Sequence, residues 1–362
     1  MAGYTLKQLG ISGKAVILAD GYFATSTGKT ANGLVRLSRI LKVIGVIDSH
    51  HAGKDAGEVL DGKRNGIPIF GSLEESVPAK PDWLIVGVAS IGGRLPEPFR
   101  LAVKQAIRNG VGVISGLHEK LSEDREFLSL AKRKGVHIID LRKPRSLYEM
   151  CQYSQLAKRI DCARIPILGT DGSIGKRTTG WLLHEALNRH GVKAEFVATG
   201  QTGLLQGADY GIPLDSILGD YMVGELEAEI FRAWEERRPQ VIIVEGQGSI
   251  SHPAYVCGSR AIICASKPTH IIVQHAPGRK VRNFGKGTVN IPMPKVQREM
   301  ELLRIYSGAD TLAITINHEN MTRTEVEEFE AWTRKDLGIP SWDVLVEGAD
   351  GLAGLVRERC VR

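Results

Sequence analysis

The first half of the chain alternates short apolar runs with amphipathic segments. The apolar runs are continuous and rich in Val and Ile, as in strands that are buried on both faces of a parallel sheet. They predict strands over 14–20, 42–48, 82–89, 111–115 and 136–140. Helically spaced apolar positions predict helices over 95–109 and 123–134, each followed by a glycine. This alternation predicts a parallel sheet with right-handed crossovers, a Rossmann-like domain over 1–145.

The second half restarts the same alternation after a polar, helix-prone stretch at 143–159, which we expect to carry the chain between two domains. Strands are expected at 165–168, 194–198, 240–244, 270–274, 311–316 and 342–346. Helices are expected at 175–190, 223–236, 295–307, 323–336 and 351–360. The predicted fold class is therefore α/β, with two three-layer α/β/α domains and mostly parallel sheets.

A glycine-rich turn opens the second domain, 146–362. Residues 164–179, RIPILGTDGSIGKRTT, place an apolar strand, a glycine-rich turn and a lysine-led helix in order. Such a turn points backbone N–H groups and the positive end of a helix dipole into one concavity, which suits a phosphate or pyrophosphate. The pattern predicts a domain of the P-loop NTPase type. The predicted cofactor-binding residues are Gly169, Thr170, Asp171, Gly172, Ser173, Ile174, Gly175, Lys176, Arg177 and Thr178.

One position of this turn departs from the usual pattern. Arg177 follows Lys176, where a nucleoside triphosphatase carries the Ser or Thr that ligates Mg²⁺. Either Thr178 replaces that hydroxyl, or the arginine neutralises a phosphate without a metal. We assign no metal ligands and expect Lys176 to act in both binding and catalysis.

Polar residues follow the strand predicted at 240–244. Glu245 puts a carboxylate at the sheet edge where phosphate-loop folds carry an acid that faces the phosphates. Glu245 and His252 are both candidates for a general base, and Ser249 is a candidate for substrate binding. The plain alternative is a solvated strand end with a surface histidine.

Further candidates for substrate binding follow other strands. Gln201 and Thr202 offer amide and hydroxyl donors that suit a carboxylate or an acyl carbonyl. Asp215 and Asp220 suit a substrate amine or a metal, unless one of them caps the helix that follows. Arg279 is a candidate for bidentate binding of a substrate carboxylate, with a solvated basic loop as the alternative.

A second glycine-lysine turn lies at 21–30, GYFATSTGKT. Phe23 stands where a phosphate loop needs a glycine, so we interpret this segment as a strand-to-helix turn, with a weak anion site as the alternative. The G-x-G-x-x-G dinucleotide pattern is absent from the chain. The Rossmann-like pattern therefore gives no reason to expect NAD.

Composition narrows the class of protein. The chain has 362 residues, enough for two domains, and its five cysteines show no C-x-x-C spacing. It contains neither a membrane-length apolar run nor a signal-peptide pattern, so we expect a cytoplasmic protein without membrane binding. The net charge is +6, and Arg279, Lys280, Arg282 and Lys286 form a basic group. No nucleic-acid-binding motif accompanies this group, so we expect a small anionic substrate. The helix at 223–236 would also allow a homo-oligomer.

The motifs together resemble known proteins. GTDGSIGK is similar to the phosphate loop of dethiobiotin synthetase. GKRTT at 175–179, GQTG at 200–203, EGQGS at 245–249 with His252-Pro253, and GKTA at 28–31 resemble a two-domain family filed as a domain of unknown function. That family has a Rossmann-like N-terminal part and a phosphate-loop C-terminal part, and the resemblance covers nearly the whole chain.

The resemblance carries an expected activity. Members of the family include D-glutamate N-acetyltransferase, which uses acetyl-CoA, so it implies acetyl transfer to the amine of D-glutamate or a similar acidic D-amino acid. The dethiobiotin synthetase likeness implies an alternative, a carboxylate–amine ligase or kinase that uses ATP with Mg²⁺. A third hypothesis is a nucleotide-sensing module without catalysis. The residue roles given above rest on position in the predicted fold alone.

Overall fold

The computed structural model describes residues 3–255, 257–282 and 289–361. The chain forms two compact units. The first comprises Met1–Arg145 with Gln201–Asp209, and the second comprises Ser146–Gly200 with Tyr210–Arg362. No helix in the described ranges is both long and apolar enough to cross a membrane.

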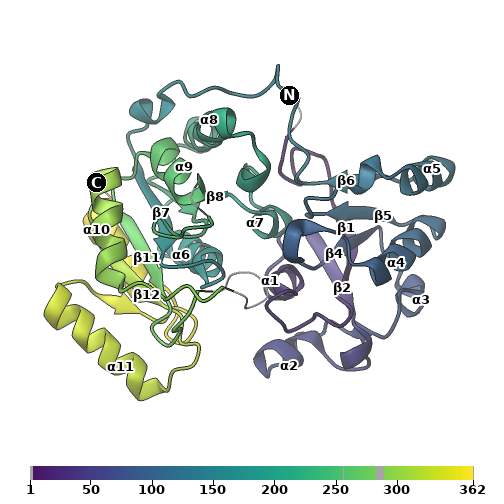
Figure 1. Cartoon of the computed structure of the whole chain (residues 1–362), viewed down its shortest axis with the longest axis horizontal. Coiled ribbons are helices and arrows are strands. Elements are labelled where there is room, and N and C mark those ends of the chain that lie inside the picture. The colour runs from purple at the N-terminus through teal and green to yellow at the C-terminus, as the bar shows by residue number, and fades with distance from the viewer. Residues whose placement is uncertain (1–2, 256, 283–288, 362) are drawn as a thin grey trace. The chain divides into compact units, whose positions relative to one another are not determined.

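The first unit is built on a six-stranded, all-parallel sheet (Figure 1). Its strand order is β3-β2-β1-β4-β5-β6, so the order reverses between β1 and β4, as in Rossmann-like folds. The strands are β1 (Gly13–Leu18), β2 (Leu41–Ile47), β3 (Ile69–Phe70), β4 (Trp83–Val86), β5 (Gly112–Ser115) and β6 (Ile138–Asp140). The helices are α1 (Lys29–Arg36), α2 (Ala56–Asp61), α3 (Leu73–Ser76), α4 (Glu97–Arg108) and α5 (Arg125–Lys134). The predicted Rossmann-like domain is confirmed.

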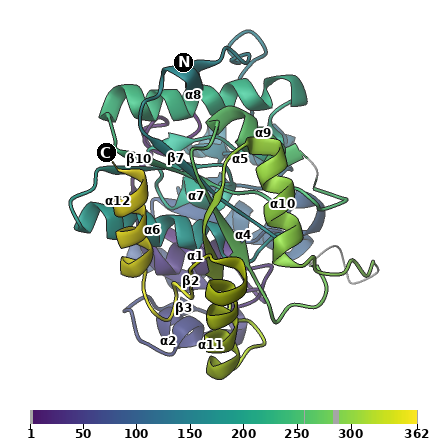
Figure 2. The same cartoon turned by 90° about the vertical axis from the view of Figure 1, so that its left-hand side faces the viewer.

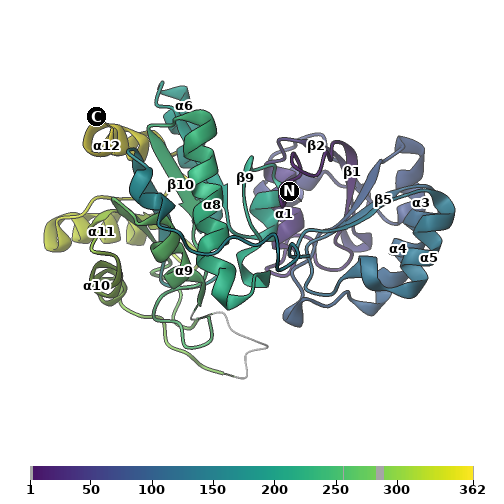
Figure 3. The same cartoon turned by 90° about the horizontal axis from the view of Figure 1, so that it is seen from above.

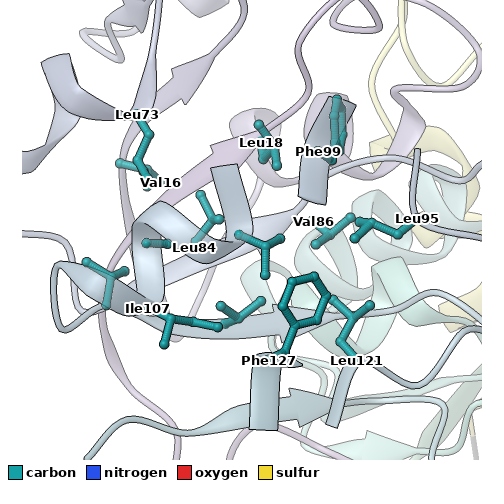
Figure 4. Close-up of a cluster of buried hydrophobic side chains, with 14 of the residues drawn as sticks. Val16, Leu18, Leu73, Leu84, Val86, Leu95, Phe99, Ile107, Leu121 and Phe127 are labelled. Atoms are coloured by element: carbon teal, nitrogen blue, oxygen red, sulfur yellow. The ribbon is translucent and has the colours of Figure 1, made fainter. Parts of the chain in front are cut away.

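The core of this unit joins the central strands to α4 and α5 (Figure 4). Val16 and Leu84 from the sheet are buried with Phe99 and Ile107 from α4 and Phe127 from α5. Fully burying a large apolar side chain contributes roughly 1.5–3 kcal/mol. The helices therefore form on the apolar stripes that their sequence spacing predicts.

Three short elements of the first unit were not predicted from the sequence patterns. These are β3, α2 and α3, which are too short to show periodicity. Local capping starts both helices, because the Asp55 carboxylate accepts the N–H groups of Gly57 and Glu58, and Ser72 accepts that of Glu75. In the turn at 21–30 the structure buries Phe23 in the core and begins α1 at Lys29.

The second unit contains a seven-stranded, all-parallel sheet (Figure 2). Its order is β13-β12-β11-β7-β10-β8-β9, which places β7 between β11 and β10. The strands are β7 (Ala163–Gly169), β8 (Ala194–Ala198), β9 (Tyr210–Gly211), β10 (Val241–Glu245), β11 (Ile271–His275), β12 (Thr311–Ile316) and β13 (Ser341–Trp342). The helices are α6 (Lys176–Arg189), α8 (Gly219–Arg237), α9 (Cys257–Ser266), α10 (Val296–Ser307), α11 (Arg323–Trp332) and α12 (Asp350–Cys360). The predicted parallel α/β fold is confirmed here too.

Two predicted segments of this unit have a different structure. The strand expected at 342–346 ends at Trp342 and continues as a turn, in which Asp343 accepts the N–H of Leu345. The stretch at 143–159 forms only a short 3-10 helix, at Leu156–Arg159 (Figure 3). Three N–H groups of the stretch bond to α8 instead, because buried Glu225 and Glu227 on that helix accept those of 151, 154 and 157. These side chains hold the segment in an irregular path.

The sequence patterns also missed three elements after residue 200. They are α7 (Gln201–Leu205), β9 and α9. The first two are short, and α7 belongs to the first compact unit although the chain enters it from the second. Helix α9 carries buried residues around much of its circumference, so it shows no clear apolar stripe.

Candidate functional site

The predicted phosphate loop joins β7 to α6, as the sequence indicates. A Cβ atom on Gly169 would lie 2.4 Å from the carbonyl oxygen of Gln274, so only glycine fits beside β11. Gly175 has a φ of 105°, a left-handed conformation that disfavours other residues. The loop thus requires glycine at both of its ends.

Lys176 ties this loop to the turn after β10. Its side chain is buried, and its ammonium group donates to the carbonyl oxygen of Asp171 and, at 2.8 Å, to that of Gly248. A Cβ atom on Gly246 would lie 1.9 Å from the carbonyl oxygen of Ile167, so the two segments approach closely. The cation of the loop therefore lies where the carboxyl ends of β7 and β10 meet.

Arg279 clamps the loop from the side of β11. Its guanidinium group binds Glu319 through two hydrogen bonds, of 2.5 and 2.7 Å, and the fully buried Asp171 through one of 2.8 Å. It also donates to the carbonyl oxygens of Gly172 and Ser173, at 3.0 and 3.2 Å. These donors all act within the protein, whereas the sequence suggested a grip on a substrate carboxylate.

The end of β11 braces the loop further. Thr170 Oγ1 lies 2.9 Å from His275 Nδ1, and Thr179 donates to Gln274 at 2.5 Å. Burial lowers the pKa of His275 to about 4, so its ring is neutral near pH 7. The same Gln274 oxygen accepts a bond of 2.7 Å from Thr315 on β12. The Thr179 hydroxyl is thus used inside the fold.

Glu245 ends β10 as a buried carboxylate. One of its oxygens accepts the backbone N–H groups of Thr199 and Gly200, at 2.9 and 3.1 Å. Burial raises the pKa of Glu245, while Arg177, these two N–H groups and Lys176 oppose the shift. An oriented carboxylate with a raised pKa beside two cations is suited to accept a proton.

His252 lies in the turn after β10, buried beside Asp171. Its Nδ1 accepts the N–H groups of Ala254 and Tyr255, at 3.1 and 3.2 Å, so the neutral ring carries its proton on Nε2. That Nε2 lies 3.8 Å from an Asp171 carboxylate oxygen. Burial, followed by the charge of Arg282, lowers the pKa of His252. This arrangement suits a hydrogen-bond donor better than a base.

The structure distributes the other candidates over both units. Ser249 is buried in the same turn as His252. Gln201 and Thr202 belong to the first unit, where Thr202 Oγ1 lies 3.0 Å from Thr30 Oγ1 of the GKT turn. Asp215 and Asp220 are exposed, and Asp220 lies in the first turn of α8, which begins four residues before the predicted start.

Some residues around the loop were not predicted. Asn317 donates to the carbonyl oxygen of Ile174 at 3.1 Å, and Glu319 pairs with Arg279. Both follow β12, whose carboxyl end lies beside that of β11, so an Asn or Glu directly after a predicted strand was the available signal. Of the basic group, Lys286 lies outside the described residues.

The fold and this loop define a two-domain protein with a Rossmann-like part and a P-loop part. The DUF1611 model, described as a domain of unknown function with a P-loop domain, matches residues 152–353. The companion DUF1611_N model, described as a Rossmann-like domain, matches residues 49–144. The chain belongs to the DUF1611 family, and the family resemblance of its motifs is confirmed.

Related proteins match over most of the chain. A crystal structure of a DUF1611 family protein from Anabaena variabilis is 29% identical, covers 96% of this chain and 99% of its own, and superposes with a TM-score of 0.87. A Pseudoalteromonas protein named D-glutamate N-acetyltransferase is 28% identical over 78% of this chain and 83% of its own length. A Tritonibacter scottomollicae protein of the same name matches with the same identity and coverage.

Proposed function

We propose that this protein is an N-acetyltransferase that moves an acetyl group from acetyl-CoA to the amine of D-glutamate or a similar acidic D-amino acid. The observation that carries the proposal is the shared name of two relatives that each align with 78% of this chain. The donor set of the phosphate loop supports it, because Lys176 and Arg177 are two cations suited to a pyrophosphate.

The residues of the loop fit this cofactor. Gly169 and Gly175 allow the backbone to approach a phosphate, and Lys176 supplies the point charge. Arg177 takes the place of a metal-ligating hydroxyl, so we propose that the loop holds a pyrophosphate without Mg²⁺. When bound, acetyl-CoA supplies a thioester whose C–S bond breaks as the C–N bond to the substrate amine forms.

Two side chains divide the proton chemistry in this proposal. Glu245 accepts the proton that the substrate ammonium must lose, since its carboxylate is held by two backbone N–H groups and has a raised pKa. His252 acts in this proposal as a hydrogen-bond donor and not as the base. Its Nδ1 already accepts two backbone N–H groups, so the proton of the neutral ring is on Nε2. Of the two candidates for the base, we therefore favour Glu245.

The test follows thiol release from acetyl-CoA across a panel of D- and L-amino acids, with and without EDTA. We expect release with acidic D-amino acids, unchanged by EDTA, and an N-acetylated product by mass spectrometry. Glu245→Gln should lose most of the rate and keep CoA binding. No thiol release across the panel by folded protein would refute the proposal. Mg²⁺-dependent ADP release with ATP would favour the ligase or kinase alternative.

A further inference from the structure

Arg282 is a second arginine near the phosphate loop, and it is 5% exposed. Its backbone N–H donates to Ile291 at 2.8 Å, in the short pairing that begins at Val281. Its Nη2 donates to Ser251 Oγ at 2.5 Å. Its Nε and Nη1 atoms are buried and have no hydrogen-bond partner among the residues that the structure describes. A buried cation thus keeps most of its donors unused.

The guanidinium group retains a complete binding edge. It has five N–H donors, and Ser251 accepts one hydrogen of Nη2. Whichever hydrogen this is, the opposite edge still offers two parallel N–H groups. Such an edge matches the geometry of a carboxylate or a phosphate.

The neighbouring carboxylates are engaged elsewhere. Glu299 accepts the N–H of Ile250 at 2.8 Å and both the N–H and the hydroxyl of Ser251. Asp171 binds Arg279 at 2.8 Å. Burial lowers the pKa of Arg282, with the charges of Glu299 and Asp171 opposing the shift. Among the described residues, no ion pair joins Arg282 to either acid.

A second buried donor lies on the adjoining turn. Ser249 is 0% exposed, and its hydroxyl has no hydrogen-bond partner in the described part of the chain. Ser249 follows Gly248, whose carbonyl oxygen accepts a bond from Lys176. Tyr255 and Val281, on the two segments that carry these donors, are exposed at 48% and 41%. The segments that carry the unused donors therefore also carry side chains exposed at the surface.

We propose that Arg282, together with Ser249, binds an oxyanion, and that this anion is a carboxylate of the amino-acid acceptor. The carboxylate assignment rests on the proposed acetyl transfer. A phosphate of the coenzyme shares the same chemistry. The carboxylate is favoured because Lys176 and Arg177 already serve the phosphates in that proposal. Arg282 then takes the role that the sequence suggested for Arg279, whose donors bind within the protein.

The test compares Arg282→Met with Arg298→Met, which removes the charge of an exposed arginine that acts electrostatically on Arg282. Arg282→Met should raise the KM for D-glutamate about 10- to 100-fold and leave the Kd for CoA unchanged. Its melting temperature should equal or exceed that of the wild type, because a buried unpaired cation is removed. Arg298→Met should match the wild type in its KM for D-glutamate, its Kd for CoA and its melting temperature. Arg282→Lys, which keeps the charge and loses the fork, should be intermediate.

Calorimetric titrations with D-glutamate, CoA and dephospho-CoA separate the sources of the anion. If Arg282→Met loses affinity for D-glutamate alone, the bound anion is the substrate carboxylate. If the variant loses affinity for CoA but not for dephospho-CoA, the oxyanion site is supported and is assigned to the coenzyme's 3′-phosphate. Equal binding by the two Met variants, or no anion binding by the wild type, overturns the proposal. If the wild type binds D-glutamate and releases no thiol, the proposed function fails while the Arg282 site remains tested.

Discussion

The ion pair between Arg279 and Glu319 should control how tightly the phosphate loop holds its ligand. Glu319→Gln keeps the shape of the side chain and removes its charge. The pair has N···O distances of 2.5 and 2.7 Å, and its side chains are 11% and 32% exposed. Hydrogen bonds to charged groups contribute about 1.5–3 kcal/mol each. The amide keeps one acceptor and the Glu319 side chain is about a third exposed to solvent, so we expect a loss of about 1 kcal/mol in the free energy of unfolding.

The loss should appear in ligand affinity as well as in stability. The same guanidinium group holds the carbonyl oxygens of Gly172 and Ser173, so a weaker anchor loosens the loop. We expect the Kd for CoA to rise about 3- to 10-fold in calorimetry. The matched control is Glu327→Gln, which breaks an exposed Arg323 pair of 3.0 Å on α11. That change should cost at most about 0.5 kcal/mol and leave CoA binding unchanged.

Two results would refute this reasoning. If Glu319→Gln and Glu327→Gln have the same Kd for CoA, the pair with Glu319 does not hold the loop. If Arg279→Lys raises the KM for the amino acid and leaves the Kd for CoA unchanged, Arg279 binds the substrate carboxylate, as the sequence suggested.

Three further predictions follow from the charges of the second unit. Lys176→Ala should raise the Kd for CoA about 10- to 100-fold in calorimetry, whereas Lys193→Ala, at the amino end of β8, should not change it. Burial lowers the folded pKa of His275 from its ordinary 6.5 to about 4, so the unfolded chain binds more protons between these values and stability is lost as the pH falls from about 6.5 to 4. His275→Asn should remove about 3 kcal/mol of this loss in urea unfolding between pH 7 and 4, and an unchanged dependence on pH would contradict the prediction. Burial and the nearby Glu347 raise the pKa of Glu330 to about 7, so stability is lost as the pH rises from about 4.5 through 7. After a discount for solvent exposure, we expect Glu330→Gln to stabilise the protein by about 1 kcal/mol at pH 8 and not at all at pH 4, as measured in thermal melts.

The sequence predicted those strands and helices whose pattern of apolar residues is continuous over several residues. The strand at 311–316 and the strand at 194–198 match the structure, because each is a mostly apolar run with all but one of its residues buried. Two-residue strands such as β9 carry no period of their own, and tertiary pairing determines them. The segment at 143–159 shows the limit of propensity, since buried Glu225 and Glu227 outweigh its helical tendency.

The phosphate loop was predictable because the residues that form it are consecutive in the sequence. The roles of the individual arginines were not predictable, because they depend on which of their N–H donors are already bonded within the folded protein. Arg279 and Arg282 lie three residues apart in one basic group, yet one is fully engaged with Glu319 and the loop while the other keeps buried, unused donors. Only the folded positions of Glu319 and Ser251 separate them.

The most direct test of the account is the transfer reaction itself, measured with acetyl-CoA and D-glutamate in the presence of EDTA. We predict stoichiometric thiol release and N-acetyl-D-glutamate, both abolished in Lys176→Ala and undiminished by removal of Mg²⁺. Absence of the acetylated product with folded, CoA-binding protein, or a reaction that proceeds only with ATP and Mg²⁺, would contradict it.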